Sequence, residues 1–183
     1  RLDPYNASDG VIWPRIAARV PAAQFVFLCA PGDRGAAVFG QRLHCAFAAA
    51  GLDWQRHCVL TPPVPHPAFP ALLRAADVFL DSIGWSGCNS TLESLPHDLP
   101  IVTVEGPLMR GRHSGAILRM MNVTEKSAAD IDGYVAVATR LARDAAFRRH
   151  VKERMAAGKH LVYRDRECIR ALEAFLEQAA RNG

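Results

Sequence analysis

The stretch from Asp81 to Glu93 holds the residues whose types and spacing best suit a binding or catalytic site. An apolar run ends at Asp81, and a loop with two glycines leads into four short side chains, Cys88, Asn89, Ser90 and Thr91. If a helix begins there, its unpaired N–H groups favour a phosphate, and Gly87 lets that ligand approach the backbone. Glu93 lies one turn further, where its carboxylate could hold a ribose hydroxyl pair. An ordinary helix capped by Asn89 or Ser90 fits the same residues, so the pattern leaves both interpretations open.

A second candidate is the proline-rich loop from Thr61 to Phe69, which follows another apolar run. Its stiff backbone could form a wall for a flat ring, with His66 or Phe69 stacked on that ring. A packed surface loop with no ligand is the alternative.

A third candidate is the segment 106–115, in which Arg110, Arg112 and His113 follow a further apolar run. These side chains could bring positive charge to a diphosphate. A solvated basic turn before a helix is the alternative.

The elements that must position these loops follow from hydrophobic periodicity. Strands are expected near 24–30, 57–60, 78–81 and 100–104. Helices are expected near 11–20, 36–50, 71–75, 89–95, 114–121, 127–143, 145–157 and 166–180. Strands that alternate with helices predict an α/β fold, a Rossmann-like doubly wound parallel sheet in one domain spanning 1–183. The apolar run 24–30 does not alternate, which predicts a strand covered on both faces.

In a parallel sheet, the loops that follow the strands emerge at one edge. The three candidate loops are therefore expected to converge on one pocket, with the helix that begins at 87–91 facing an open cleft. The last helix could pack across the domain or, with the other helices from about 126 onwards, onto a partner domain absent from this chain.

Composition limits the class of protein. The chain has 183 residues, of which 50% are hydrophobic and 22% charged, so most of it is not disordered. The net charge of +4 suits a phosphate-bearing ligand but does not by itself indicate a nucleic-acid partner. No apolar run approaches the about 18 residues of a membrane span. The chain starts with Arg1 rather than Met, as expected of a fragment or a processed product.

Cysteine usage indicates a reducing, cytoplasmic compartment. The chain has five cysteines, an odd number, and no C-x-x-C pair. Cys29, Cys45 and Cys58 lie among apolar neighbours and are expected to be buried. Cys88 has no evident His–acid pair to activate it, and the common metalloprotease, hydrolase and P-loop motifs do not occur.

The order of the motifs resembles that of a known family. The segments "FLDSIGWSGCNSTLESLPHDLPIVTVEG" and "RGRHSGAIL" resemble the C-terminal half of the O-linked N-acetylglucosamine transferase family, whose fold is GT-B. "IWPRIAARVPAAQFVFL" and "LLRAADVFLD" fit the same half, so that the resemblance covers about residues 1–180 in order. It implies an inverting glycosyltransferase that binds a UDP-sugar donor without a metal and glycosylates protein side chains. Related bacterial enzymes that glucosylate asparagine share this half.

The resemblance also assigns roles to residues. The family's phosphate-binding helix start, a His-Thr-Thr-Gly run, falls on Cys88–Thr91, and its ribose-binding acid falls on Glu93. Its uracil loop falls on Val64, Pro65 and His66, with Phe69 in place of a ring-contacting His. Its phosphate-contacting Lys falls on or next to Arg1, and the Arg of its Ser-Arg element falls on Arg112.

The resemblance places the acceptor base and groove in an N-terminal half, so this chain alone is expected to transfer nothing. Cys88 replaces the family His and removes one side-chain donor to the phosphate, which favours a degenerate nucleotide-binding or scaffold module as an alternative. A nucleotide-sugar epimerase of the same fold is another, although it needs an acid–base pair. Upstream helical repeats of about 34 residues would mark an enzyme with a protein acceptor.

Overall fold

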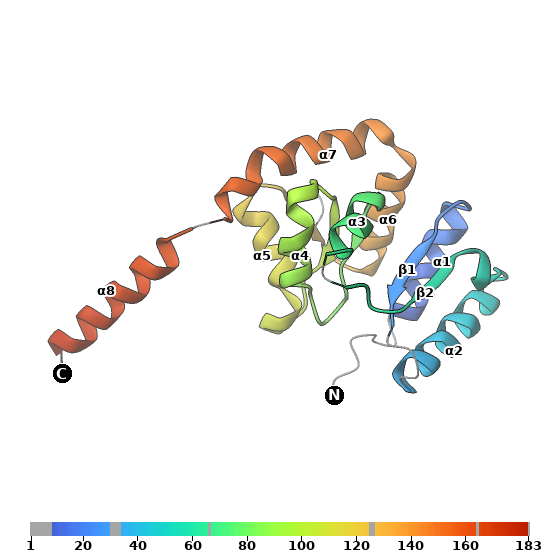
Figure 1. Cartoon of the computed structure of the whole chain (residues 1–183), viewed down its shortest axis with the longest axis horizontal. Coiled ribbons are helices and arrows are strands. Elements are labelled where there is room, and N and C mark those ends of the chain that lie inside the picture. Colours follow the sequence, from blue (N-terminus) through green and yellow to red (C-terminus); the bar gives the residue numbers. More distant parts are fainter. Residues whose placement is uncertain (1–8, 30–33, 66, 125–126, 164, 183) are drawn as a thin grey trace.

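The computed structural model describes residues 9–29, 34–65, 67–124, 127–163 and 165–182 (Figure 1). Its first part consists of α1 (Asp9–Arg19), β1 (Phe25–Leu28), α2 (Arg34–Ala49) and β2 (Cys58–Thr61). The middle contains α3 (Phe69–Ala75), β3 (Phe79–Leu80), α4 (Asn89–Ser94), β4 (Ile101–Val104), α5 (His113–Met120) and β5 (Ser127–Ala128). The chain ends with α6 (Ile131–Arg143), α7 (Ala145–Gly158) and α8 (Glu167–Asn182).

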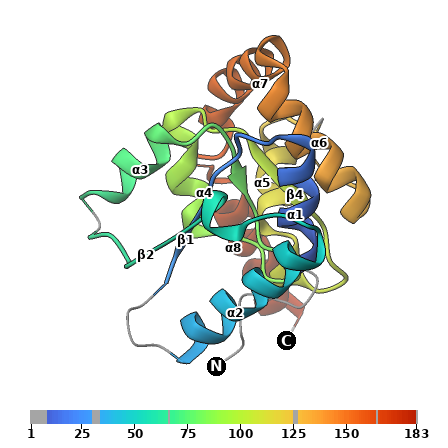
Figure 2. The same cartoon turned by 90° about the vertical axis from the view of Figure 1, so that its right-hand side faces the viewer.

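Every strand pair among the described residues is parallel, as predicted. β1 pairs with β2, and β4 pairs with both β3 and β5. Helices connect successive paired strands, which parallel pairing requires. The ladders form two separate groups, β1-β2 and β3-β4-β5, within the described ranges. In Figure 1 the first group lies to the right of the second, and Figure 2 views it from that side.

Aromatic rings build the core of the first group. Trp13 of α1 lies with its ring centroid 5.5 Å from that of Phe25 and 5.5 Å from that of Phe27. Phe27 in turn meets Phe39 of α2 at 5.0 Å. These tilted and edge-on contacts are the favoured arrangements of aromatic pairs. They seat α1 and α2 against one face of β1.

The other face of β1 is not covered by the described residues, which corrects the expectation of a strand buried on both sides. Val26 is 47% exposed, whereas its neighbours Phe25 and Phe27 are buried. Val59, the partner of Val26 across the ladder, is also exposed. The apolar run without alternation therefore predicted the strand correctly, but its prediction that both faces are covered was wrong.

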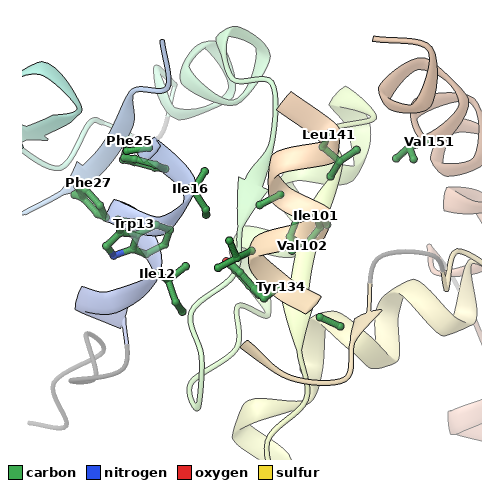
Figure 3. Packing of buried hydrophobic residues seen from close by; sticks show 14 of the residues in the cluster. Ile12, Trp13, Ile16, Phe25, Phe27, Ile101, Val102, Tyr134, Leu141 and Val151 are labelled. Atoms are coloured by element: carbon green, nitrogen blue, oxygen red, sulfur yellow. The ribbon is translucent and has the colours of Figure 1, made fainter. Parts of the chain in front are cut away.

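Helix α6 joins the two groups. Its buried face includes Tyr134 and Leu141, and it packs against α1 as well as β4 and β5. Figure 3 shows Ile12 and Ile16 of α1 to the left of Tyr134, and Ile101 and Val102 of β4 at α6. Side-chain packing, rather than strand pairing, connects the first group to the rest.

The start of α6 corrects the predicted helix over 127–143. Ser127 and Ala128 instead form β5, which pairs with Thr103 and Val104. The helix begins only after Asp130, whose Oδ1 accepts a hydrogen bond from the N–H of Gly133 at 2.7 Å. Such an N-cap side chain fixes where a helix can start.

Helix α8 extends away from the rest of the chain (Figure 1), and its described side chains are exposed. They include Ile169, Leu172, Phe175 and Leu176, which lie at helical spacing. By contrast, α6 and α7 pack within the domain. Whether the helices beyond 126 also pack on another domain stays a prediction. No helix in the described ranges has the length and apolarity to span a membrane.

Candidate functional site

A buried carboxylate anchors the loop between β3 and α4. Asp81 follows β3 directly and is only 2% exposed. Its Oδ2 accepts hydrogen bonds from Ser86 Oγ and from Thr103 Oγ1 of β4, each at 2.7 Å. Its Oδ1 accepts a hydrogen bond from the N–H of Gly87, also at 2.7 Å. One side chain thus ties both the loop and a neighbouring strand together.

Two effects act on the pKa of Asp81 in opposite directions. Burial raises it, because a charged carboxylate loses its hydration. The hydrogen bonds from Gly87, Thr103 and Ser86 lower it, since they stabilise the charged form, and the nearby Ser114 side chain acts in the same direction. The effect of burial is the larger, and the pKa lies above its ordinary value.

The carbonyl group of Gly87 is held as firmly as its N–H group. Thr91 Oγ1 and Ser114 Oγ each lie 3.1 Å from the Gly87 carbonyl oxygen, which accepts a hydrogen bond from one of them. The N–H of Ser114 donates to Ser86 Oγ at 2.9 Å, which closes the network through α5. A Cβ at position 87 would lie 2.7 Å from Ser90 Oγ and 2.9 Å from Thr91 Oγ1, so a larger residue would displace these hydroxyls.

Helix α4 presents its first turn to the surface. Cys88, one residue before the expected caps Asn89 and Ser90, occupies the N-cap position and makes no side-chain cap bond. Cys88 and Asn89 are exposed. Within the described part of the chain, the N–H groups of Cys88, Asn89 and Ser90 have no hydrogen-bond acceptor. They are the donors that the sequence assigned to a phosphate, whereas the N–H of Gly87 is engaged by Asp81.

The loop after β4 meets the loop after β3, as predicted. The N–H of Ser86 donates to the carbonyl oxygen of Arg110 at 2.8 Å. The Arg110 guanidinium lies 5.8 Å from the centroid of the exposed Trp85 ring, a cation–π arrangement. Arg112 is exposed and donates from Nε to the carbonyl oxygen of Gly106 at 2.7 Å. Two of the three candidate loops therefore lie together.

The remaining predicted site residues that the structure describes are placed by their burial and by the elements that carry them. Glu93 is half-buried on α4, and α3, which begins at Phe69, packs beside α4. Val64 is half-buried and Pro65 exposed, and the Pro65 carbonyl accepts the N–H of Ala68 at 2.8 Å. His66 and Arg1 lie outside the described residues. The convergence of this loop with the other two stays a prediction.

The sequence pattern assigned no role to the buried residues that hold the site from beneath, although three of the four lie in the candidate segments. Asp81, Ser86, Thr103 and Ser114 are all buried, and each makes side-chain hydrogen bonds in the network. One signal was available, because an acid at the end of a core strand must be paired to be buried.

The cysteines and metal-ligating residues add no second site. Cys58 is buried and Cys29 partly buried. Cys45 was expected to be buried but is exposed on α2. Cys88 and Cys168 are exposed as well. All five are free thiols. In the described ranges, no three His, Cys, Asp or Glu side chains are grouped so as to hold a metal ion.

Comparison with known proteins finds matches to a curated sequence and to a solved structure. The chain is 26% identical over 133 residues to a probable UDP-N-acetylglucosamine–peptide N-acetylglucosaminyltransferase, SPINDLY, of Petunia hybrida. This covers 73% of the chain and 14% of that protein. The solved structure of a mutant O-GlcNAc transferase from Thermobaculum terrenum matches with a TM-score of 0.76 and 27% identity. That match covers 96% of this chain and 33% of the enzyme chain.

No protein-family model matches the chain. The chain spans about one third of the solved enzyme and one seventh of the curated relative. Nearly the whole chain nevertheless follows the solved structure, since the match covers 96% of it. The comparisons therefore confirm the resemblance to the O-linked N-acetylglucosamine transferase-like glycosyltransferases, together with their Rossmann-like GT-B type of fold.

Proposed function

We propose that this chain is the UDP-sugar-binding part of an inverting glycosyltransferase that modifies protein side chains. The observation that carries the proposal is the start of α4, where Cys88 and Asn89 are exposed and the N–H groups of Cys88, Asn89 and Ser90 have no acceptor in the described residues. The two matched proteins, a probable N-acetylglucosaminyltransferase and an O-GlcNAc transferase, support it.

In this proposal the chain stabilises the leaving group. The N–H groups at the start of α4 receive the diphosphate, where negative charge grows as the bond to the sugar breaks. Arg110 and Arg112, on the adjoining loop, add positive charge, and Arg1 contributes from the N-terminal side. These are preorganised donors and charges, so no metal is required for this task.

The nucleoside is held by the neighbouring elements. Glu93 accepts hydrogen bonds from the ribose hydroxyls. The loop with Val64, Pro65 and His66 provides the wall for uracil, and Phe69 packs against the ring. The chain then forms a single nucleotide-sugar-binding domain of a cytoplasmic enzyme whose acceptor base and groove lie on another part of the protein. By itself it binds the nucleotide and transfers no sugar.

Cys88, in place of the family His, does not remove the backbone donors. The N–H groups depend on the position of the peptide chain rather than on side-chain identity. The loss of one side-chain donor does favour a scaffold module as the second candidate, and the two functions differ in whether UDP binds.

Calorimetric titration of the chain with UDP tests the proposal. We expect saturable binding at one site and at least tenfold weaker affinity in Glu93→Ala, about 1.4 kcal/mol. Glu153→Ala, an exposed acid on α7, serves as the matched control and is expected to bind as the unaltered chain does. Absence of UDP binding at millimolar concentration would favour the scaffold module, and equal affinity of Glu93→Ala would remove Glu93 from the site.

A further inference from the structure

Asp81 lies beneath the proposed diphosphate site. Its carboxylate is buried and receives hydrogen bonds from the Ser86 hydroxyl, the Gly87 N–H and the Thr103 hydroxyl. Burying a carboxylate is costly unless its oxygens are paired, and hydrogen bonds to a charged group are stronger than those between neutral groups. Two of the three hydrogen bonds that this carboxylate accepts come from the loop that leads into α4.

The network fixes the peptide group between Gly87 and Cys88. The Gly87 carbonyl oxygen faces the hydroxyls of Thr91 and Ser114, each at 3.1 Å. No peptide bond in the described chain is cis, so the Cys88 N–H points opposite to that carbonyl. Because the carbonyl is directed inward, the Cys88 N–H is directed outward, toward the proposed ligand.

Asp81 controls both ends of this arrangement. Its Oδ1 holds the N–H of Gly87 directly. Its Oδ2 orients the Ser86 hydroxyl, which accepts the N–H of Ser114 at 2.9 Å and so places the Ser114 hydroxyl next to the Gly87 carbonyl. The side chain therefore acts on the ligand-facing N–H groups through other residues.

We propose that Asp81 is a positioning residue, which sets the direction of the first N–H groups of α4 so that they meet the diphosphate. The identity of the ligand in this proposal rests on the proposed function, whereas the effect of Asp81 on the N–H directions does not depend on it. A merely structural role would be to join β3 to β4. Such a role would affect the free energy of unfolding without changing these N–H directions.

The variants are Asp81→Asn and Ser86→Ala, with Tyr134→Phe as control. Asn keeps the size of Asp but has one acceptor oxygen in place of two, so the three donors cannot all be satisfied. Ser86→Ala keeps the carboxylate and removes the link to Ser114, and it decides the question if Asp81→Asn does not fold. Tyr134 donates to the backbone carbonyl of Asp81 at 2.9 Å, so Tyr134→Phe removes a buried bond to the same residue and leaves the carboxylate unchanged.

The first measurement needs no ligand. Residual dipolar couplings of the N–H vectors of Cys88, Asn89 and Ser90 are expected to change in Asp81→Asn and Ser86→Ala and to stay as in the unaltered chain in Tyr134→Phe. The second is UDP affinity by calorimetry, expected to fall at least tenfold in the first two variants and less than twofold in the control.

The two measurements separate the two proposals. Absence of UDP binding to the unaltered chain contradicts the proposed function, and the couplings then still decide the role of Asp81. Unchanged couplings in Asp81→Asn and Ser86→Ala overturn the positioning role. So does a loss of affinity in Tyr134→Phe as large as theirs, because it would show that stability alone controls binding.

Discussion

The hydroxyl oxygens of Thr91 and Ser114 lie 2.7 Å apart in the interior, although the two residues belong to different helices. Each hydroxyl also lies 3.1 Å from the carbonyl oxygen of Gly87. Since each has one proton, one hydroxyl donates to the other and the second donates to the carbonyl. The starts of α4 and α5 are thereby joined at the point where the proposed ligand binds.

This pairing predicts non-additive effects on stability. We expect Thr91→Val and Ser114→Ala each to lower the free energy of unfolding by about 1–3 kcal/mol, because a buried partner loses its hydrogen bond. The double variant should lose less than the sum, with an interaction energy of at least about 0.5 kcal/mol. Urea unfolding of the four proteins measures this. Strict additivity would show that the two hydroxyls are not coupled.

A second prediction concerns Gly158 at the end of α7. A Cβ there would meet the carbonyl oxygen of Met121 and lie 3.0 Å from the Met121 Cβ. Gly158→Ala is therefore expected to destabilise the fold by about 1–3 kcal/mol, the usual cost of overpacking. Gly40→Ala is the control, because it lies within α2 and, among the described residues, its Cβ would meet only the flexible end of Leu60, at 3.3 Å. Thermal unfolding should place Gly158→Ala well below Gly40→Ala.

A third prediction concerns the pH dependence that Asp81 imposes. Burial raises its pKa in the folded chain, so the folded chain keeps this proton to higher pH than the unfolded chain does. The stability of the unaltered chain relative to Asp81→Asn should therefore fall as the pH rises from about 4 to the folded-state pKa, and then level off. Urea unfolding of both proteins at several pH values gives this difference. A difference that grows with pH would mean that the hydrogen bonds outweigh burial.

A fourth prediction concerns the different reactivity of the buried and exposed cysteine thiols toward alkylation. Burial raises the pKa of Cys58 to about 12, so little thiolate forms at pH 8. Cys45, Cys88 and Cys168 are exposed. Iodoacetamide at pH 8 should therefore modify these three within the time in which Cys58 stays intact in the folded chain, as mass spectrometry of peptides can show. Equal labelling in urea is the control, and early labelling of Cys58 in the folded chain would contradict its burial.

The sequence predicted the strands because their residues are apolar in continuous runs. The expected strand at 100–104 is β4 (Ile101–Val104), and the expected strand at 57–60 is β2 (Cys58–Thr61). β5 could not be predicted in the same way. Ser127 and Ala128 have no apolar pattern, and their strand exists because they pair with Thr103 and Val104, which are distant in sequence.

The site, like the strands, was predictable only in part. Parallel strands implied that the loops after β3 and β4 emerge together, and the hydrogen bond between Ser86 and Arg110 shows that they do. The engagement of the Gly87 N–H was not predictable, because it depends on how the loop turns back to Asp81. Cys45 was misplaced for a related reason, since apolar neighbours in sequence do not show which side of a helix a residue occupies.

The division of the strands into two ladders leaves a boundary in the molecule that no strand pairing among the described residues crosses. Across it, in the described residues, the contacts come from side chains such as those of α1 against α6, with no strand-to-strand hydrogen bonds. Packed helices can slide by small shear motions, whereas a β-ladder must break its hydrogen bonds to move. A load on the chain would thus displace the β1-β2 part as a block, while the Asp81 network, which lies wholly on the other side, keeps its geometry.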